Sequence, residues 1–212
     1  MKKSNMALFI TFFVFCFIFT HASPVGWRNE VTVADQLFYT ECYITTDNSG
    51  RIHVATREEG QGERCSDLRY WRSTDNGTNW NLINANFDKG VPGVLYRSTD
   101  IGTIGDTIMI IYDRPKTILF VRSIHGGDNW ENEVTVESDQ QYPLHPKIAI
   151  DGGTLHAIYA QWPSAATKEY EIYRRYSTDR GSNWSTAQRL TQAQRNSWHP
   201  AVSVNASAIH IV

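Results

Sequence analysis

The sequence has no excess of charge of either sign, few cysteines and, beyond its N-terminus, no long hydrophobic run. Its 20 lysine and arginine residues are balanced by 22 aspartate and glutamate residues, for a formal charge of −2. A nucleic-acid-binding protein would carry a strong basic excess, so that class is excluded. After residue 19, no apolar stretch approaches the roughly 20 residues that a membrane-spanning helix needs. No cysteine–histidine group has the spacing of zinc ligands, so we expect no metal and no cofactor.

The chain also lacks a sustained 3.6-residue apolar period. Short segments with a two-residue alternation take its place, as in 147–150 and 171–176. Hydrophobic residues make up 41% of the chain and aromatic residues 12%, which is enough for a packed core. We therefore predict an all-β protein that is almost without helix.

The N-terminal residues have the organisation of a secretory signal peptide. Lys2 and Lys3 precede the apolar stretch 6–19, and small residues follow as far as Ala22. We predict that residues 1–22 are removed, which makes the mature protein secreted or periplasmic, with no membrane association after cleavage. An uncleaved membrane anchor is the alternative, although the stretch is short for one.

The sequence repeats itself about every 52 residues. A Ser-x-Asp-x-Gly-x-x-Trp segment occupies 73–80 and 177–184, with a degenerate copy at 123–130, and the three tryptophans are 50 and 54 residues apart. The dipeptides at 145–146 and 199–200 are both His-Pro, again 54 residues apart. Repeated units of 40 to 55 residues with four short strands each are typical of the blades of a β-propeller.

We predict blades at about 37–88, 91–140 and 141–194, and the start of a fourth at 197–212, in an incomplete propeller domain that covers 23–212. The segment 27–33 nearly copies 130–136, so we expect an orphan outer strand at 27–36 that completes the last blade. Since propellers have four to eight blades, these three and a half blades predict an N-terminal fragment of a longer protein, with about six blades at full length.

The repeated segment has the chemistry of a turn. Serine and aspartate side chains hydrogen-bond to nearby backbone groups, glycine supplies a positive φ, and tryptophan anchors the turn by burying a large area. These segments resemble Asp boxes, and the mature chain resembles the sialidase-like (BNR-repeat) β-propellers. The resemblance implies a structural role for Ser73, Asp75, Gly77 and Trp80; for Ser123, Gly127 and Trp130; and for Ser177, Asp179, Gly181 and Trp184.

The resemblance also implies a ligand-binding face, formed by the starts of first strands and the loops between second and third strands. On this sequence the implied face contains Arg57, Glu58, Asp113, Arg114, His145, Trp162 and His199. Packing roles are the alternative for the two histidines and for Trp162. Cys42 and Cys65 lie at the same end of the first blade, so we predict a disulfide between them, with two buried thiols as the alternative.

Sialidases of this family use an arginine triad, a tyrosine–glutamate pair and an aspartate acid/base. Residues 29–50 contain no arginine where the first triad member is expected, and only Glu63 and Asp67 lie near the place of the aspartate. We therefore predict an exported propeller that binds a glycan or another extracellular ligand, without a complete catalytic set in this chain. The alternatives are an exo-acting sialidase or other glycoside hydrolase whose remaining catalytic residues lie beyond this sequence, and a structural or protein-interaction module.

Overall fold

The computed structural model describes residues 31–33, 38–59, 66–88, 98–193, 195–205 and 208–212. Every regular element in these ranges is a β-strand. The predicted signal peptide, most of the predicted strand at 27–36, Glu63 and Cys65 lie outside the described residues, and so does the predicted Cys42–Cys65 disulfide.

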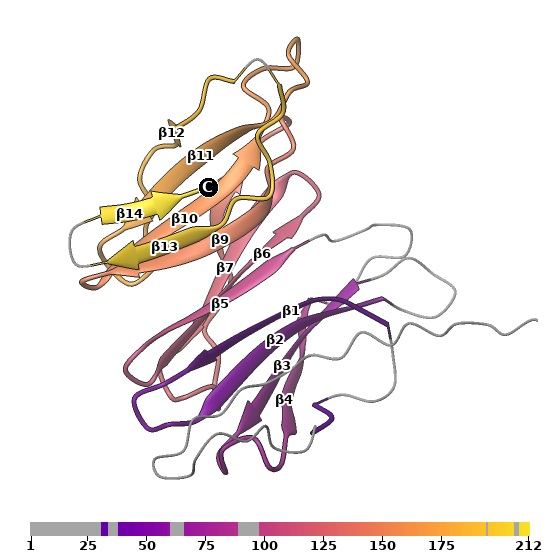
Figure 1. The fold of residues 1–212 in the computed structure, drawn as a ribbon, viewed down its shortest axis with the longest axis vertical. Helices are drawn as coiled ribbons and strands as arrows, with labels where there is room; N and C mark the ends of the chain where they lie inside the picture. Colours follow the sequence, from indigo (N-terminus) through magenta and orange to yellow (C-terminus); the bar gives the residue numbers. More distant parts are fainter. Residues whose placement is uncertain (1–30, 34–37, 60–65, 89–97, 194, 206–207) are drawn as a thin grey trace, which may run out of the picture.

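Three four-stranded antiparallel sheets follow one another in chain order (Figure 1). The first contains β1 (Phe38–Thr46), β2 (Ile52–Glu59), β3 (Ser66–Ser73) and β4 (Asn81–Asp88). The second contains β5 (Thr99–Ile104), β6 (Thr107–Arg114), β7 (Thr117–Ser123) and β8 (Val134–Ser138). The third contains β9 (Leu144–Asp151), β10 (Thr154–Gln161), β11 (Glu171–Ser177) and β12 (Gln188–Arg189). A two-stranded sheet, β13 (Val202–Asn205) and β14 (Ala208–Ile211), ends the chain.

Within each sheet, every strand pairs with the next strand along the chain, so every sheet is a meander. The all-β prediction and the four-stranded antiparallel units are thus confirmed. Among the first strands, β5 contacts both β1 and β9, and β13 contacts β9. Consequently the sheets meet along one edge, and side chains from distant parts of the sequence gather there.

The core lies between the sheets. Strand β6 shows why: Ile108, Ile110 and Tyr112 pack toward the first sheet, whereas Met109 and Ile111 pack toward the third. Alternate residues of a strand point to opposite faces, so a strand covered on both faces needs apolar residues at every position. Each such side chain contributes roughly 1.5–3 kcal/mol when it is fully buried.

The turns between third and fourth strands hold a repeated set of hydrogen bonds. At 177–184 the Ser177 hydroxyl accepts from the Gly181 N–H (2.8 Å) and donates to Asp179 Oδ1 (2.7 Å). Asp179 in turn accepts from the backbone and side-chain N–H groups of Asn183 (2.9 and 2.7 Å). These bonds from Asn183 hold the pKa of Asp179 at about 2, below its ordinary value.

The turn at 73–80 repeats this geometry with Ser73, Asp75 and Asn79. In the degenerate copy His125 replaces the aspartate, yet the Ser123 hydroxyl still accepts from the Gly127 N–H (2.9 Å). All of these side chains bond within their own turn, which agrees with a folding role.

Candidate functional site

The site is built from equivalent positions on the first strands of successive sheets. Tyr43, Asp100 and Lys147 each lie opposite the equivalent residue of a second strand, namely Ala55, Ile111 and Ile158. In the last sheet Ala201 occupies this place, since its backbone exchanges hydrogen bonds with Val212. Because β1, β5, β9 and the start of β13 meet along one edge, these four positions form a row across that edge.

Lys147 is bound to Tyr43 across 104 residues of sequence. Its ammonium group donates a hydrogen bond to the Tyr43 hydroxyl and lies 3.7 Å from the centre of the tyrosine ring. Burial lowers the pKa of Lys147, although the nearby carboxylates of Asp100 and Glu41 oppose this. Burial, together with the same carboxylates, raises the pKa of Tyr43 to about 12, so its hydroxyl keeps its proton.

Asp100 joins the second and third sheets. Its carboxylate accepts hydrogen bonds from the backbone N–H groups of Ile148 (2.9 Å) and Ile101 (3.0 Å). Even so, burial raises the pKa of Asp100 to about 6, because desolvation disfavours the charged form more than these bonds and Lys147 favour it. Asp100 therefore holds a proton at weakly acidic pH.

A second row lies two residues earlier in the chain, near the starts of the same strands, and contains Glu41, Ser98, His145 and His199. Glu41 accepts from the Thr99 N–H (3.2 Å), and burial raises the pKa of its carboxyl group. The rings of His145 and His199 lie 3.9 Å apart between centroids. Both histidines have a positive φ, 54° and 58°, which is uncommon outside glycine and costs backbone strain.

The residues of the two rows, with the exception of Asp100, line a cavity of about 330 Å³. Its lining residues are Glu41, Tyr43, Ser98, His145, Lys147, His199, Pro200 and Ala201. Carboxyl, phenol, imidazole, ammonium and hydroxyl groups thus converge on a small space, which is the mixture of donors and acceptors that a polyhydroxylated ligand requires. Glu41 lines this cavity, and since burial raises the pKa of its carboxyl group, it could also exchange a proton with such a ligand.

The residues expected on the ligand-binding face are only partly brought together here. His145 and His199 line the cavity. Arg57 is 0% exposed and donates to the Asp113 carbonyl (3.0 Å), so it connects the first sheet to the second. Buried Asp113 accepts from the backbone N–H groups of Ser98 (2.9 Å) and His145 (3.3 Å).

Arg114 and Trp162, like Arg57 and Asp113, are not among the residues that line the cavity. Arg114 forms an ion pair with Glu133 (2.9 Å), and Trp162 is half-buried among aromatic rings. The backbone of Glu58 pairs with that of Asp67, which is half-buried.

The loop assignment of four of these residues was wrong. Arg57 and Glu58 lie in β2, and Asp113 and Arg114 lie in β6, because the backbone ladders to β3 and β7 continue past them. The C-terminal ends of β2 and β6 are therefore parts of the sheets and not of the loops that follow.

Sequence reasoning missed Glu41, Tyr43, Asp100 and Lys147. The available signal was a polar residue at matching positions of the first strands, in segments that otherwise alternate with apolar residues. Such polar positions indicate a face that is neither core nor ordinary surface.

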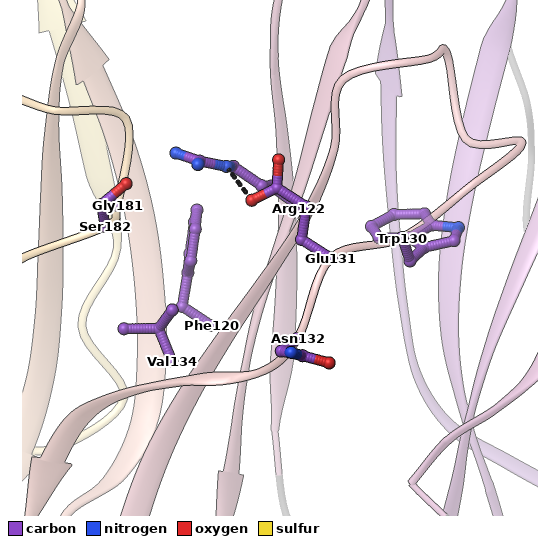
Figure 2. A pocket seen from close by; sticks show the side chains of 8 residues that line it. All are labelled: Phe120, Arg122, Trp130, Glu131, Asn132, Val134, Gly181 and Ser182. Carbon is purple, nitrogen blue, oxygen red and sulfur yellow. Dashed lines mark hydrogen bonds and ion pairs between the residues drawn. The ribbon is translucent and has the colours of Figure 1, made fainter.

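A second cavity of about 500 Å³ lies at the other end of the sheets, between the second sheet and the turn at 177–184 (Figure 2). It is lined by Phe120, Arg122, Trp130, Glu131, Asn132, Val134, Gly181 and Ser182. Arg122 pairs with Glu131 (2.8 Å) and donates to the Arg180 carbonyl (2.5 Å). The Arg122 guanidinium is thus already engaged by Glu131 and by the turn at 177–184. This makes the second cavity the weaker candidate for a ligand-binding site.

Among the described residues there is no helix that could cross a membrane. The same part of the chain contains no group of three or more His, Cys, Asp or Glu side chains arranged to hold a metal ion.

No protein-family model matches the chain, and no curated protein matches its sequence. Solved structures do match. An α-L-arabinofuranosidase of Fusarium graminearum aligns with a TM-score of 0.61 at 14% identity, over 77% of this chain and 52% of the enzyme. The α-L-arabinanase of Penicillium chrysogenum in complex with arabinobiose gives 0.59 at 14%, over 77% and 53%. An exo-β-1,3-galactanase of Clostridium thermocellum gives 0.54 at 16%, over 80% and 40%.

These enzymes are β-propellers, and at such low identity the likeness concerns the fold alone. It supports the predicted β-propeller architecture. Membership of the sialidase-like family and the number of blades stay predictions. The chain spans about half the length of the first two enzymes.

Proposed function

We propose that this chain is part of an exported β-propeller that binds a carbohydrate in the cavity between β1, β5, β9 and the start of β13. The observation that carries the proposal is the convergence of polar groups from four sheets on that cavity. The fold supports it, because the matching solved structures include carbohydrate-active enzymes, one of them in complex with arabinobiose. Sugar hydroxyls both donate and accept hydrogen bonds, as do the groups that line this cavity.

Hydrolysis of a glycosidic bond is a second candidate, favoured by one observation. Glycoside hydrolases commonly use one protonated carboxylic acid and one carboxylate. Glu41 lines the cavity, and burial raises the pKa of its carboxyl group, which favours the protonated form that a general acid needs. We infer that any catalysis in this cavity uses Glu41 as the acid.

A sialidase mechanism receives less support. The first arginine of its triad is expected before Arg57, and residues 29–50 contain no arginine. A structural or protein-interaction role is the third alternative, and a failure of all carbohydrate binding would favour it.

Replacement of His199 tests the binding site. His199 is exposed and lines the cavity, so His199→Ala should remove ligand contacts without unfolding the protein. We expect an affinity about fivefold to tenfold lower, which corresponds to about one lost hydrogen bond. His125→Ala is the matched control, because His125 is also exposed but lies in the turn at 123–130.

Affinity electrophoresis in gels that contain arabinan or β-1,3-galactan, followed by calorimetry with the retarding glycan, measures the effect. Retardation that His199→Ala weakens and His125→Ala preserves supports the proposal. Retardation by neither glycan, or equal binding by wild type and His199→Ala, would refute it.

A further inference from the structure

We infer that a row of aromatic rings extends the cavity into a binding track for an oligosaccharide of at least two sugar units. This inference rests on the proposed function and names its ligand class. The row consists of Tyr142, Trp162, Tyr170 and Trp198, and it reaches the cavity through His199 and His145.

The rings form an unbroken series of contacts. From Tyr142 to Trp162, on to Tyr170 and then to Trp198, the successive centroids are 4.8, 5.5 and 5.7 Å apart. Trp198 then meets the His199 ring at 5.4 Å. Because His199 stacks on His145 and both line the cavity, the row is continuous with the proposed binding site.

Backbone hydrogen bonds hold the row in place before any ligand binds. The Trp162 N–H donates to the Gln141 carbonyl (3.0 Å), which ties the β10–β11 loop to the loop that carries Tyr142. The Ser197 N–H donates to the Tyr170 carbonyl (2.7 Å), which keeps Trp198 beside Tyr170. A preorganised surface binds with a smaller loss of conformational entropy.

The two ends of the row are open to solvent. Tyr142 is 41% exposed and Trp198 is 50% exposed, values that are high for large aromatic side chains. An exposed ring offers a flat apolar face to the C–H face of a sugar, while its polar edge reaches the surrounding hydroxyls.

The surroundings favour a glycan over a protein partner. Trp198 is flanked in the chain by the polar residues Asn196, Ser197 and His199, and the polar side chains of Glu41, Ser98 and Lys147 are among those that line the cavity next to it. A protein-docking site would instead have an apolar centre with a polar rim. A row of rings beside hydrogen-bonding groups matches the C–H faces and the hydroxyls of successive sugar units.

The inference predicts that affinity increases with the length of the glycan and that Trp198 carries the increase. The probes are arabinose with arabinotetraose, and galactose with β-1,3-galactotetraose, titrated by calorimetry into the purified protein. Wild type should bind one tetrasaccharide about tenfold more tightly than the matching monosaccharide, because an aromatic contact is of that order. Trp198→Ala should abolish this difference and leave the monosaccharide affinity unchanged, and Trp198→Phe should restore part of it.

Tyr176→Ala is the matched control. Tyr176 is also an exposed aromatic residue, 44% accessible on β11 of the same sheet, but it is outside the row. Its replacement should preserve the length dependence.

Equal affinities of the wild type for mono- and tetrasaccharides would overturn the inference of a binding track. So would a Trp198→Ala protein that binds the tetrasaccharide as tightly as the wild type does. If His199→Ala still weakened monosaccharide binding in that case, the proposed function would survive. Failure of all four sugars to bind would overturn both.

Discussion

Replacing Gly181 with alanine should destabilise the joint between the second and third sheets. Gly181 has a φ of +90°, and a Cβ atom added there would lie 2.2 Å from Cε1 of Phe120. Phe120 is 1% exposed and belongs to the preceding sheet, where it meets the Trp184 ring edge-on at 5.5 Å. The aromatic ring therefore has little freedom to move away from a new methyl group.

Two costs add at this position. The left-handed backbone costs a non-glycine residue about 1–2 kcal/mol, and overpacking a full core costs about 1–3 kcal/mol. The free energy of unfolding should thus fall by about 2–5 kcal/mol, a large part of the roughly 5–15 kcal/mol of a typical domain. Gly153→Ala separates the two costs, because Gly153 has a φ of +98° but nothing within 4 Å of its added Cβ.

Equilibrium urea unfolding, followed by tryptophan fluorescence, measures both variants. We expect Gly153→Ala to lose only the backbone part, about 1–2 kcal/mol. Equal losses in the two variants would refute the idea that the turn glycine makes room for the neighbouring sheet. Gly127 gives a second test in the equivalent place, since its added Cβ would lie 2.1 Å from the Tyr70 hydroxyl oxygen.

Two further predictions concern buried ionisable groups. The pKa of Asp100 is raised to about 6 from 3.8, so its contribution to stability is complete below about pH 4 and is lost as the pH rises through 6. The free energy of unfolding should fall by roughly 3 kcal/mol from this group between pH 4 and 7, and Asp100→Asn should flatten that slope in urea titrations at several pH values. Arg57→Ala should lower the free energy of unfolding by more than about 2 kcal/mol, because it removes a fully buried side chain bonded to the Asp113 carbonyl. An unchanged melting temperature would instead indicate that Arg57 is a surface residue.

The strands and the repeated turns could be predicted because their signals are local. In the turn at 177–184 the hydrogen bonds of the Asp179 carboxylate join residues at most four positions apart, so the motif is visible in a short window. The alternation of β11 is equally local, and the structure places a strand there. Element ends were harder: β2 continues to Glu59 because its partner strand continues to pair with it.

The candidate binding site could not be predicted from local sequence signals in the same way. Tyr43 and Lys147 are separated by 104 residues, and neither stands out among nearby polar residues. Arg57 looked like a surface residue because arginine usually is one, yet the packing of the second sheet against the first covers it completely.

The sequence by itself determined the strands, the turns and the repeat that makes every sheet alike, because these depend on side-chain alternation and on hydrogen bonds between close neighbours. Only the tertiary structure decided which polar residues meet. The first strands pack edge to edge, and this contact brings Tyr43, Asp100 and Lys147 together and takes Arg57 out of solvent. That outcome depends on how one sheet packs on the next, and no short stretch of sequence contains both surfaces.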